Sequence, residues 1–120
     1  MERSKLEEIA SKLSKYFNIP SPHIDFWDSI PDYFYADISC NHLGKKGNGF
    51  YIPSERMIVL ESLNPKIQKK YSDEAVLHCF SHEFAHHLET VLIGEFPSHR
   101  GKFAGMVRRV RRLIKILSYE

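Results

Sequence analysis

Two histidines and a glutamate lie close together in the middle of the chain, in the segment His82-Glu83-Phe84-Ala85-His86. On an α-helix, residues spaced by four lie one turn apart on the same face, so both imidazoles can reach one metal ion. Glu83 lies about 100° around the helix, close enough to hold a water on the metal but badly placed to bind the metal itself. This is the HExxH spacing, in which two neutral imidazoles bind zinc and the carboxylate takes a proton from the zinc-bound water. The segment predicts a zinc hydrolase site with His82 and His86 as ligands and Glu83 as the general base.

The surrounding residues predict a helix over residues 72–94 that would carry this motif. Ser72 has the side chain of an N-cap, Asp73 and Glu74 place negative charge in the first turn, and Gly94 is a typical stop. Apolar residues recur between these ends at spacings of three or four. They are Val76, Leu77, Phe80, Phe84, Leu88, Val91 and Leu92. The motif is therefore expected in the middle of a mostly buried helix.

A catalytic zinc ion usually has three protein ligands, so one more is needed beyond the pair on this helix. The favoured candidate is His99. The helix is expected to run about six residues past His86, roughly 9 Å. Residues 94–98 can span at most about 17 Å, which is enough for the chain to turn and come back. Glu89 and Glu95 remain alternative ligands, and the absence of any metal site also remains open.

Two further histidines flank the motif on the same predicted helix. His78 lies one turn before His82 on nearly the same face, and we expect it to line the cleft or to support a metal ligand by hydrogen bonding. His87 points elsewhere, so we do not expect it to bind the metal. We expect it either at the surface or, like His78, in a hydrogen bond that supports a metal ligand. The two cysteines, Cys40 and Cys79, form neither a zinc ribbon nor a disulfide framework.

The rest of the chain predicts a small α+β domain that would position the motif. Residues 2–17 have the apolar period of an amphipathic helix, and residues 33–39 have the composition of a strand. Residues 50–52 and 57–60 predict a β-hairpin. The expected order is an N-terminal helix, a three-stranded antiparallel sheet, the metal helix and a basic C-terminal helix, all in one domain. An exposed strand edge beside the zinc is expected to accept an extended peptide as an added strand.

Residues 98–118 predict a second amphipathic helix whose cations gather on the side opposite to its apolar stripe. Residues 100–120 hold seven Lys or Arg and one acidic residue, a net charge of +6 that leaves −4 on residues 1–99. The cations of this basic face are Arg108, Arg109, Arg111, Arg112 and Lys115, with Arg109 at the margin. Two interpretations stay open: an ordinary solvated face, or a face that contacts the phosphates of a nucleic acid such as DNA. Membrane binding is disfavoured, because the apolar side must pack on the domain.

The composition is that of an ordinary globular protein, because 42% of the 120 residues are hydrophobic and 12% aromatic. No apolar run approaches the length of a membrane span, and the first residues lack the pattern of a signal peptide. We therefore expect an intracellular protein of the cytoplasm, the nucleoid or the nucleus.

The motif and its surroundings resemble the SprT-like (Spartan-type) zinc metalloproteases. In that family a third histidine opens an HGxxF-like segment about fifteen residues after HExxH, and here His99-x-Gly101-x-Phe103 follows the motif. The residues of the predicted hairpin also look like the strand pair that precedes the metal helix in the family, so the resemblance covers about residues 49–112. The glycine is displaced by one position, and the four-cysteine zinc ribbon of many family members is absent from this sequence.

The resemblance implies a zincin-like endopeptidase that holds one Zn²⁺ through His82, His86 and His99. It also implies a protein or peptide substrate, with proteins bound or crosslinked to DNA as the expected kind and DNA repair as the setting. Two other classes remain open. One is a regulatory HExxH protease that cuts a single partner, such as a repressor or an antitoxin. The other is a non-enzymatic DNA-binding module whose metal site is structural or absent.

Overall fold

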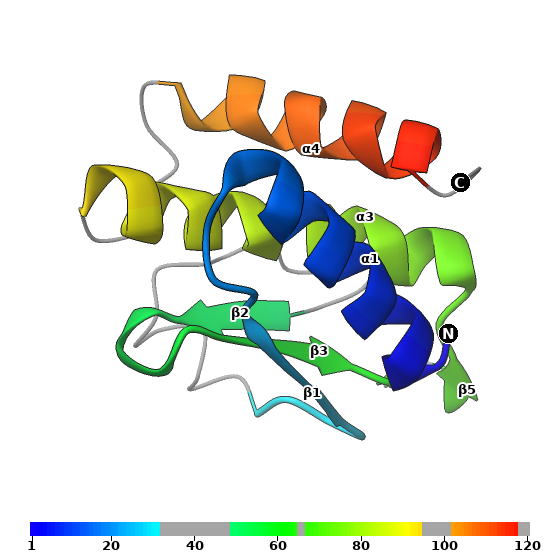
Figure 1. Ribbon diagram of the computed structural model, residues 1–120. Helices are drawn as coiled ribbons and strands as arrows, with labels where there is room; N and C mark the ends of the chain where they lie inside the picture. Colours follow the sequence, from blue (N-terminus) through cyan, green and yellow to red (C-terminus); the bar gives the residue numbers. More distant parts are fainter. Residues whose placement is uncertain (32–48, 65–66, 95–101, 118–120) are drawn as a thin grey trace.

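In the part of the chain that the structure describes, three α-helices lie over one face of a small mixed β-sheet (Figure 1). The computed structural model describes residues 1–31, 49–64, 67–94 and 102–117. The elements are α1 (Arg3–Phe17), β1 (His23–Trp27), β2 (Gly49–Ile52), the 3₁₀ turn η1 (Pro53–Glu55), β3 (Met57–Glu61), β4 (Leu63–Asn64), β5 (Lys69–Lys70), α3 (Asp73–Leu88), the π-helical turn η2 (Glu89–Ile93) and α4 (Phe103–Leu117). The α+β class expected from the sequence is confirmed.

The main sheet has the strand order β1-β3-β2. Strands β2 and β3 form the expected antiparallel hairpin, with Phe50 opposite Val59 and Tyr51 opposite Ile58. Strand β1 runs parallel to β3, so the expectation of a wholly antiparallel sheet is wrong. Hairpin direction follows from a local turn, whereas no local signal sets the direction of a strand that joins the sheet from far along the chain. The strand expected at residues 33–39 lies outside the described residues.

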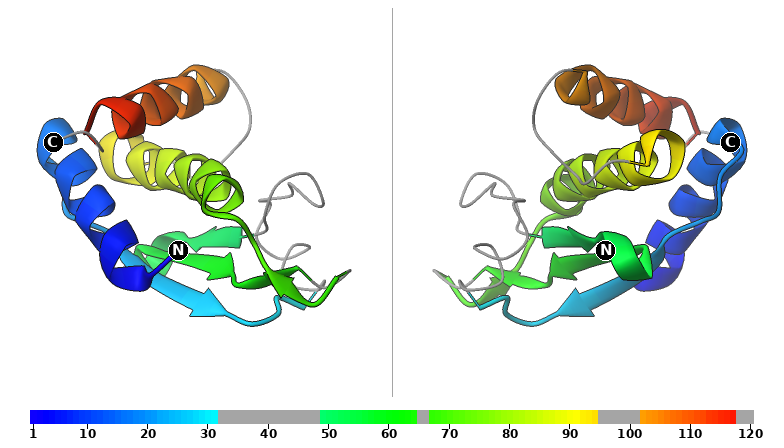
Figure 2. Two further views of the ribbon diagram at one scale, coloured as in Figure 1. Left: turned by 90° about the vertical axis from the view of Figure 1, so that its right-hand side faces the viewer. Right: turned by 90° about the vertical axis from the view of Figure 1, so that its left-hand side faces the viewer.

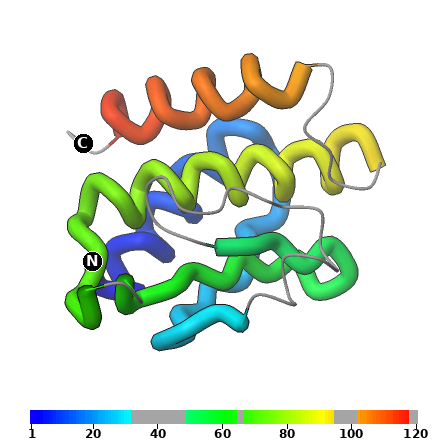
Figure 3. Tube along the Cα trace, turned by 180° about the vertical axis from the view of Figure 1, so that it is seen from behind, coloured from blue at the N-terminus to red at the C-terminus, as the bar shows by residue number. Residues whose placement is uncertain are grey.

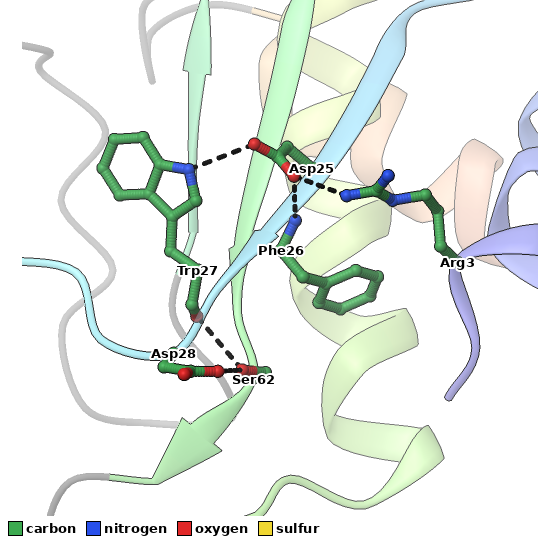
Figure 4. Close-up of polar contacts among 6 residues, drawn as sticks. All are labelled: Arg3, Asp25, Phe26, Trp27, Asp28 and Ser62. Atoms are coloured by element: carbon green, nitrogen blue, oxygen red, sulfur yellow. Dashed lines mark hydrogen bonds and ion pairs between the residues drawn. The ribbon is translucent and has the colours of Figure 1, made fainter.

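A cluster of hydrogen bonds holds β1 against α1 and β3 (Figure 4). One carboxylate oxygen of Asp25 accepts hydrogen bonds from the Arg3 guanidinium at 2.6 Å and from the Phe26 amide at 2.9 Å. The other accepts the indole N–H of Trp27 at 3.2 Å. The amide of Ser62, just beyond β3, donates to the Trp27 carbonyl at 2.8 Å. No tight turn joins β1 to its sheet neighbour β3, and these hydrogen bonds help to hold the strand in place.

The three helices expected from the apolar periods are confirmed, and α3 has the predicted ends. The Ser72 hydroxyl caps its first turn by accepting a hydrogen bond from the Ala75 amide at 3.1 Å. Past Leu88 the helix widens into η2, which stops at Gly94 with a left-handed φ of 78°. None of the helices in the described residues is long and apolar enough to cross a membrane.

Helix α3 is the central element, packed on β2 and β3 on one side and on α4 on the other. Helix α1 covers β1 and contacts α4, while α3 and α4 run antiparallel side by side (Figures 2 and 3). Gly49 of β2 has no room for a side chain, because an added Cβ would lie 2.7 Å from the Val59 carbonyl oxygen of β3 and 2.8 Å from the Cys79 Sγ of α3. The core between helices and sheet contains Leu6, Leu13, Tyr51, Ile58, Phe80, Phe84 and Val110.

Candidate metal centre

The imidazoles of His82 and His86 lie next to each other on the side of α3 that faces the start of α4. Their ring centroids are 4.9 Å apart and the ring planes meet at 67°. Phe103, the first residue of α4, contacts both rings, with centroids 4.8 Å from His82 and 4.3 Å from His86. The ring of Phe103 is nearly parallel to that of His86, at 20°. The tertiary contact between α3 and α4 therefore holds the two imidazoles in position.

The motif is deeply buried. The side chains of Glu83 and His86 have 0% exposure, and His82 is partly buried. An apolar cluster of Ala85, Phe103 and Val107 lies beside them between α3 and α4. Charges interact more strongly in such water-poor surroundings than in water.

Glu89 lies next to the second histidine of the motif. Its carboxylate oxygen Oε1 is 3.5 Å from Nδ1 of His86, and its exposure is 6%. Metal-binding histidines commonly face a carboxylate or a carbonyl with the ring nitrogen that does not bind the metal. If His86 binds a metal, this contact would leave Nε2 as the nitrogen that faces the ion. It gives Glu89 the position of an orienting group, one that sequence reasoning had considered only as an alternative ligand.

The predicted third ligand, His99, lies outside the described residues, as does the alternative Glu95. Among the residues that are described, no group of three or more His, Cys, Asp or Glu side chains could hold a metal ion. The described part of the site thus contributes two imidazoles. Neutral imidazole nitrogens one helical turn apart are donors suited to zinc, whereas calcium and magnesium require oxygen ligands. The donor chemistry present fits zinc.

The ring of His87 makes structural contacts rather than joining the two expected metal ligands. It is fully buried rather than at the surface, with Nε2 2.8 Å from the carbonyl oxygen of Pro20 and Nδ1 2.8 Å from the hydroxyl of Tyr51. A carbonyl can only accept, so Nε2 carries the proton and Nδ1 accepts from Tyr51. Burial lowers the pKa of His87 and raises the pKa of Tyr51 to about 12. Both groups stay neutral and join α3 to β2 and to the α1–β1 connection.

His78 is hydrogen-bonded to Arg111 of α4. The Arg111 Nη2 lies 3.1 Å from Nε2 of His78 and donates to the His78 carbonyl at 3.3 Å, while its Nε donates to the Ser81 hydroxyl at 2.9 Å. The Ser81 hydroxyl in turn donates to the His78 carbonyl at 2.8 Å. Because a guanidinium only donates, Nε2 of His78 accepts this hydrogen bond from Arg111. Partial burial lowers the pKa of Arg111, which remains a cation at neutral pH.

The basic face is smaller than the helical wheel of α4 suggests. Arg111 turns toward α3, and Arg109 lies over the rings of Tyr16 and Phe17 of α1, at 5.8 Å and 5.5 Å from their centroids. Both side chains therefore join α4 to the other helices. Arg108, Arg112 and Lys115 are exposed.

Comparisons with protein-family models, with curated protein sequences and with solved structures found no match for this chain. The resemblance to SprT-like proteases therefore rests on the motif residues alone. Any functional conclusion must be drawn from the chemistry and geometry of the residues themselves.

Proposed function

We propose that this protein is a zinc-dependent endopeptidase of the SprT-like kind. The observation that carries the proposal is the pair of imidazoles on α3, 4.9 Å apart, with the fully buried carboxylate of Glu83 on the same turn. Two neutral nitrogen donors beside a carboxylate in water-poor surroundings are the parts that metal-assisted hydrolysis of a peptide bond needs.

His82, His86 and His99 would hold the ion. His99 precedes Phe103 by four residues, and Phe103 contacts both motif histidines. A chain of this length spans at most about 14 Å, so the predicted third ligand is tethered close to the pair. When bound there, zinc would lower the pKa of a water and polarise the scissile carbonyl. Glu89 would keep the ring of His86 turned so that Nε2 faces the ion.

Glu83 would act as the general base. Its carboxylate would take a proton from the attacking water and deliver it to the departing amine. General acid–base catalysis of this kind accelerates a reaction by about 10² to 10⁴-fold. The buried apolar neighbours Ala85 and Val107 would keep other water away from this transfer. Since Glu83 has 0% exposure, the substrate must displace covering atoms in order to bind.

An extended polypeptide is the substrate form that the sheet would accommodate. Strand β2 packs against α3 and has β3 as its strand neighbour among the described residues. A peptide added along the other side of β2 would gain main-chain hydrogen bonds beside the metal helix. The exposed cations Arg108, Arg112 and Lys115 would favour proteins that are bound or crosslinked to DNA.

The test measures zinc content and cleavage of an unstructured protein by the wild type, Glu83→Gln and Glu7→Gln. We expect about one zinc per chain in all three, with cleavage lost at least 100-fold only in Glu83→Gln. Glu7 is an exposed glutamate of α1 and provides the matched control. A wild type that binds zinc, cuts nothing and behaves as the Glu83 variant does would show that the proposal is wrong. Cleavage restricted to a single partner would instead favour a regulatory protease.

A further inference from the structure

A pocket of about 470 Å³ opens one helical turn from the metal motif, where the first half of α3 faces the second half of α4. Figures 1 and 3 show these two halves side by side at the end of the helix pair opposite to η2. The volume of this pocket lies within the range of about 300 to 1,000 Å³ that is common for small-ligand sites. The pocket is lined by Glu74, Leu77, His78, Arg111, Ile114 and Lys115.

The guanidinium of Arg111 is held in place at this pocket. Its Nε and Nη2 donate to Ser81 and His78, at distances between 2.9 and 3.3 Å. Its Nη1 makes no hydrogen bond to any residue of the described segments. Nη1 therefore has two N–H groups for a ligand, on a planar group whose rotamer is already fixed. A fixed guanidinium is a strong and geometrically selective site for a carboxylate.

The other lining residues narrow the class of ligand. Arg111 and Lys115 carry two positive charges against the single negative charge of Glu74, so an anion is favoured. Leu77 and Ile114 add aliphatic surface to the pocket. The methylene groups of an acidic side chain would be buried against this surface, whereas a free inorganic anion has no apolar group to bury. The combination matches a carboxylate on a short aliphatic stem.

The pocket also lies at a suitable distance from the proposed reaction centre. His78, which lines it, precedes the first metal ligand His82 by four residues on α3, about 6 Å along the helix axis. An extended peptide advances about 3.3 Å per residue. A side chain in the pocket would therefore belong to a residue about two positions from the bond that is cut.

We propose that this pocket binds an acidic side chain of the polypeptide substrate, about two residues from the scissile bond, and that Arg111 receives its carboxylate. The position relative to the scissile bond rests on the proposed peptidase function. The binding of the acidic side chain does not, because none of the pocket residues is a proposed metal ligand.

The binding test uses the metal-free protein and two blocked tetrapeptides, acetyl-Ala-Leu-Glu-Ala-amide and its Gln counterpart, followed by NMR. We expect at least tenfold tighter binding of the Glu peptide, with shifts in the Arg111 Nε–H signal and in the amides of residues 74–78 and 111–115. Arg111→Lys keeps the charge but loses the planar fork, and it should lower the preference. Lys115→Met removes the second positive charge that lines the pocket, and it should lower the preference too. Equal affinity for the two peptides, or shifts elsewhere, would overturn the proposal.

A second experiment separates the pocket from the peptidase. With zinc added, the ratio of kcat/KM for longer Glu and Gln peptides should favour Glu by about the same factor as binding. Selective binding of the Glu peptide without any cleavage would support the pocket and contradict the peptidase function. Cleavage of both peptides at equal rates would support the peptidase and overturn the pocket. Tighter binding of inorganic phosphate than of the Glu peptide would also overturn it.

Discussion

The bridge from Tyr51 through His87 to Pro20 predicts how stability depends on pH. His87 is buried and neutral, with one ring nitrogen donating to a carbonyl and the other accepting from a hydroxyl. Burial is the main cause that lowers its pKa below the ordinary 6.5, and the positive charge of Arg56 lowers it further, while the Pro20 carbonyl opposes this. Protonation in the folded protein would require a charge in the core and a reversal of the Tyr51 hydrogen bond.

The sign and size of the effect follow from proton binding. Below about pH 6.5 the unfolded chain binds a proton at His87 that the folded protein does not bind, so the free energy of unfolding falls as the pH falls. Above that pH the contribution of the neutral histidine is fully present. Each pH unit below it costs at most about 1.4 kcal/mol. Between pH 7.5 and 5.5 the loss due to His87 is therefore at most about 1.4 kcal/mol, since most of it falls within the lower unit.

Urea unfolding between pH 7.5 and 5.5, with EDTA present to exclude metal effects, measures this loss. His87→Gln is the matched variant, because glutamine can donate to a carbonyl but does not titrate. The wild type should lose up to about 1.4 kcal/mol more than the variant over this range. Tyr51→Phe removes the donor to Nδ1 and should cost about 1 to 3 kcal/mol at pH 7.5. Its pH dependence should be shallower, because a histidine without that donor takes up a proton more easily. Parallel curves for the wild type and His87→Gln would refute the assignment of a buried neutral His87.

Three further predictions concern packing, metal affinity and the basic face. Gly49→Ala should destabilise the fold by several kcal/mol in urea unfolding, because its Cβ would lie 2.7 Å from the Val59 carbonyl oxygen. Gly105→Ala, at an exposed position of α4, should instead stabilise the fold by about 0.5 to 1 kcal/mol. Similar effects of both changes would contradict the close packing around Gly49. Glu89→Gln should weaken zinc binding about tenfold in a chelator competition, and an unchanged affinity would remove its orienting role. The double variant Arg108→Glu with Arg112→Glu should abolish binding to duplex DNA, whereas the control Lys5→Glu on α1 should not. For the wild type, the logarithm of the binding constant should fall with the logarithm of the salt concentration by about 0.9 per phosphate contact. If the wild type does not bind DNA at 50 mM salt, the hypothesis that the basic face contacts nucleic acid is wrong.

Local patterns in the sequence were sufficient for the helices and the hairpin. The apolar period of α1, α3 and α4, the cap at Ser72 and the stop at Gly94 all act within a few residues of each other, so they can be read without a fold. The same is true of the motif pair, because a helix alone places His82 and His86 one turn apart.

Contacts between distant segments could not be predicted in this way. His87 and Pro20 are separated by 67 residues, and nothing near either residue indicates the other. Arg111 was expected on the solvent side of α4, and its hydrogen bonds to His78 and Ser81 exist only because α3 and α4 are antiparallel at that point. The parallel direction of β1 likewise appears only in its pairing with β3, which is a contact between distant segments of the chain.

The residue types show which side chains could do chemistry, and local helix geometry places two of the expected ligands on one helical face. The surroundings of the remaining histidines and arginines depend on how the helices pack against one another and against the sheet. Burial and hydrogen bonding assign His87 to the support of the fold, and hydrogen bonds give Arg111 a fixed position beside a pocket. Arg109 is exposed, and its contacts with the rings of Tyr16 and Phe17 join α4 to α1. Those assignments depend on what lies across the helix interfaces, and a residue's own neighbours in the chain carry no information about that.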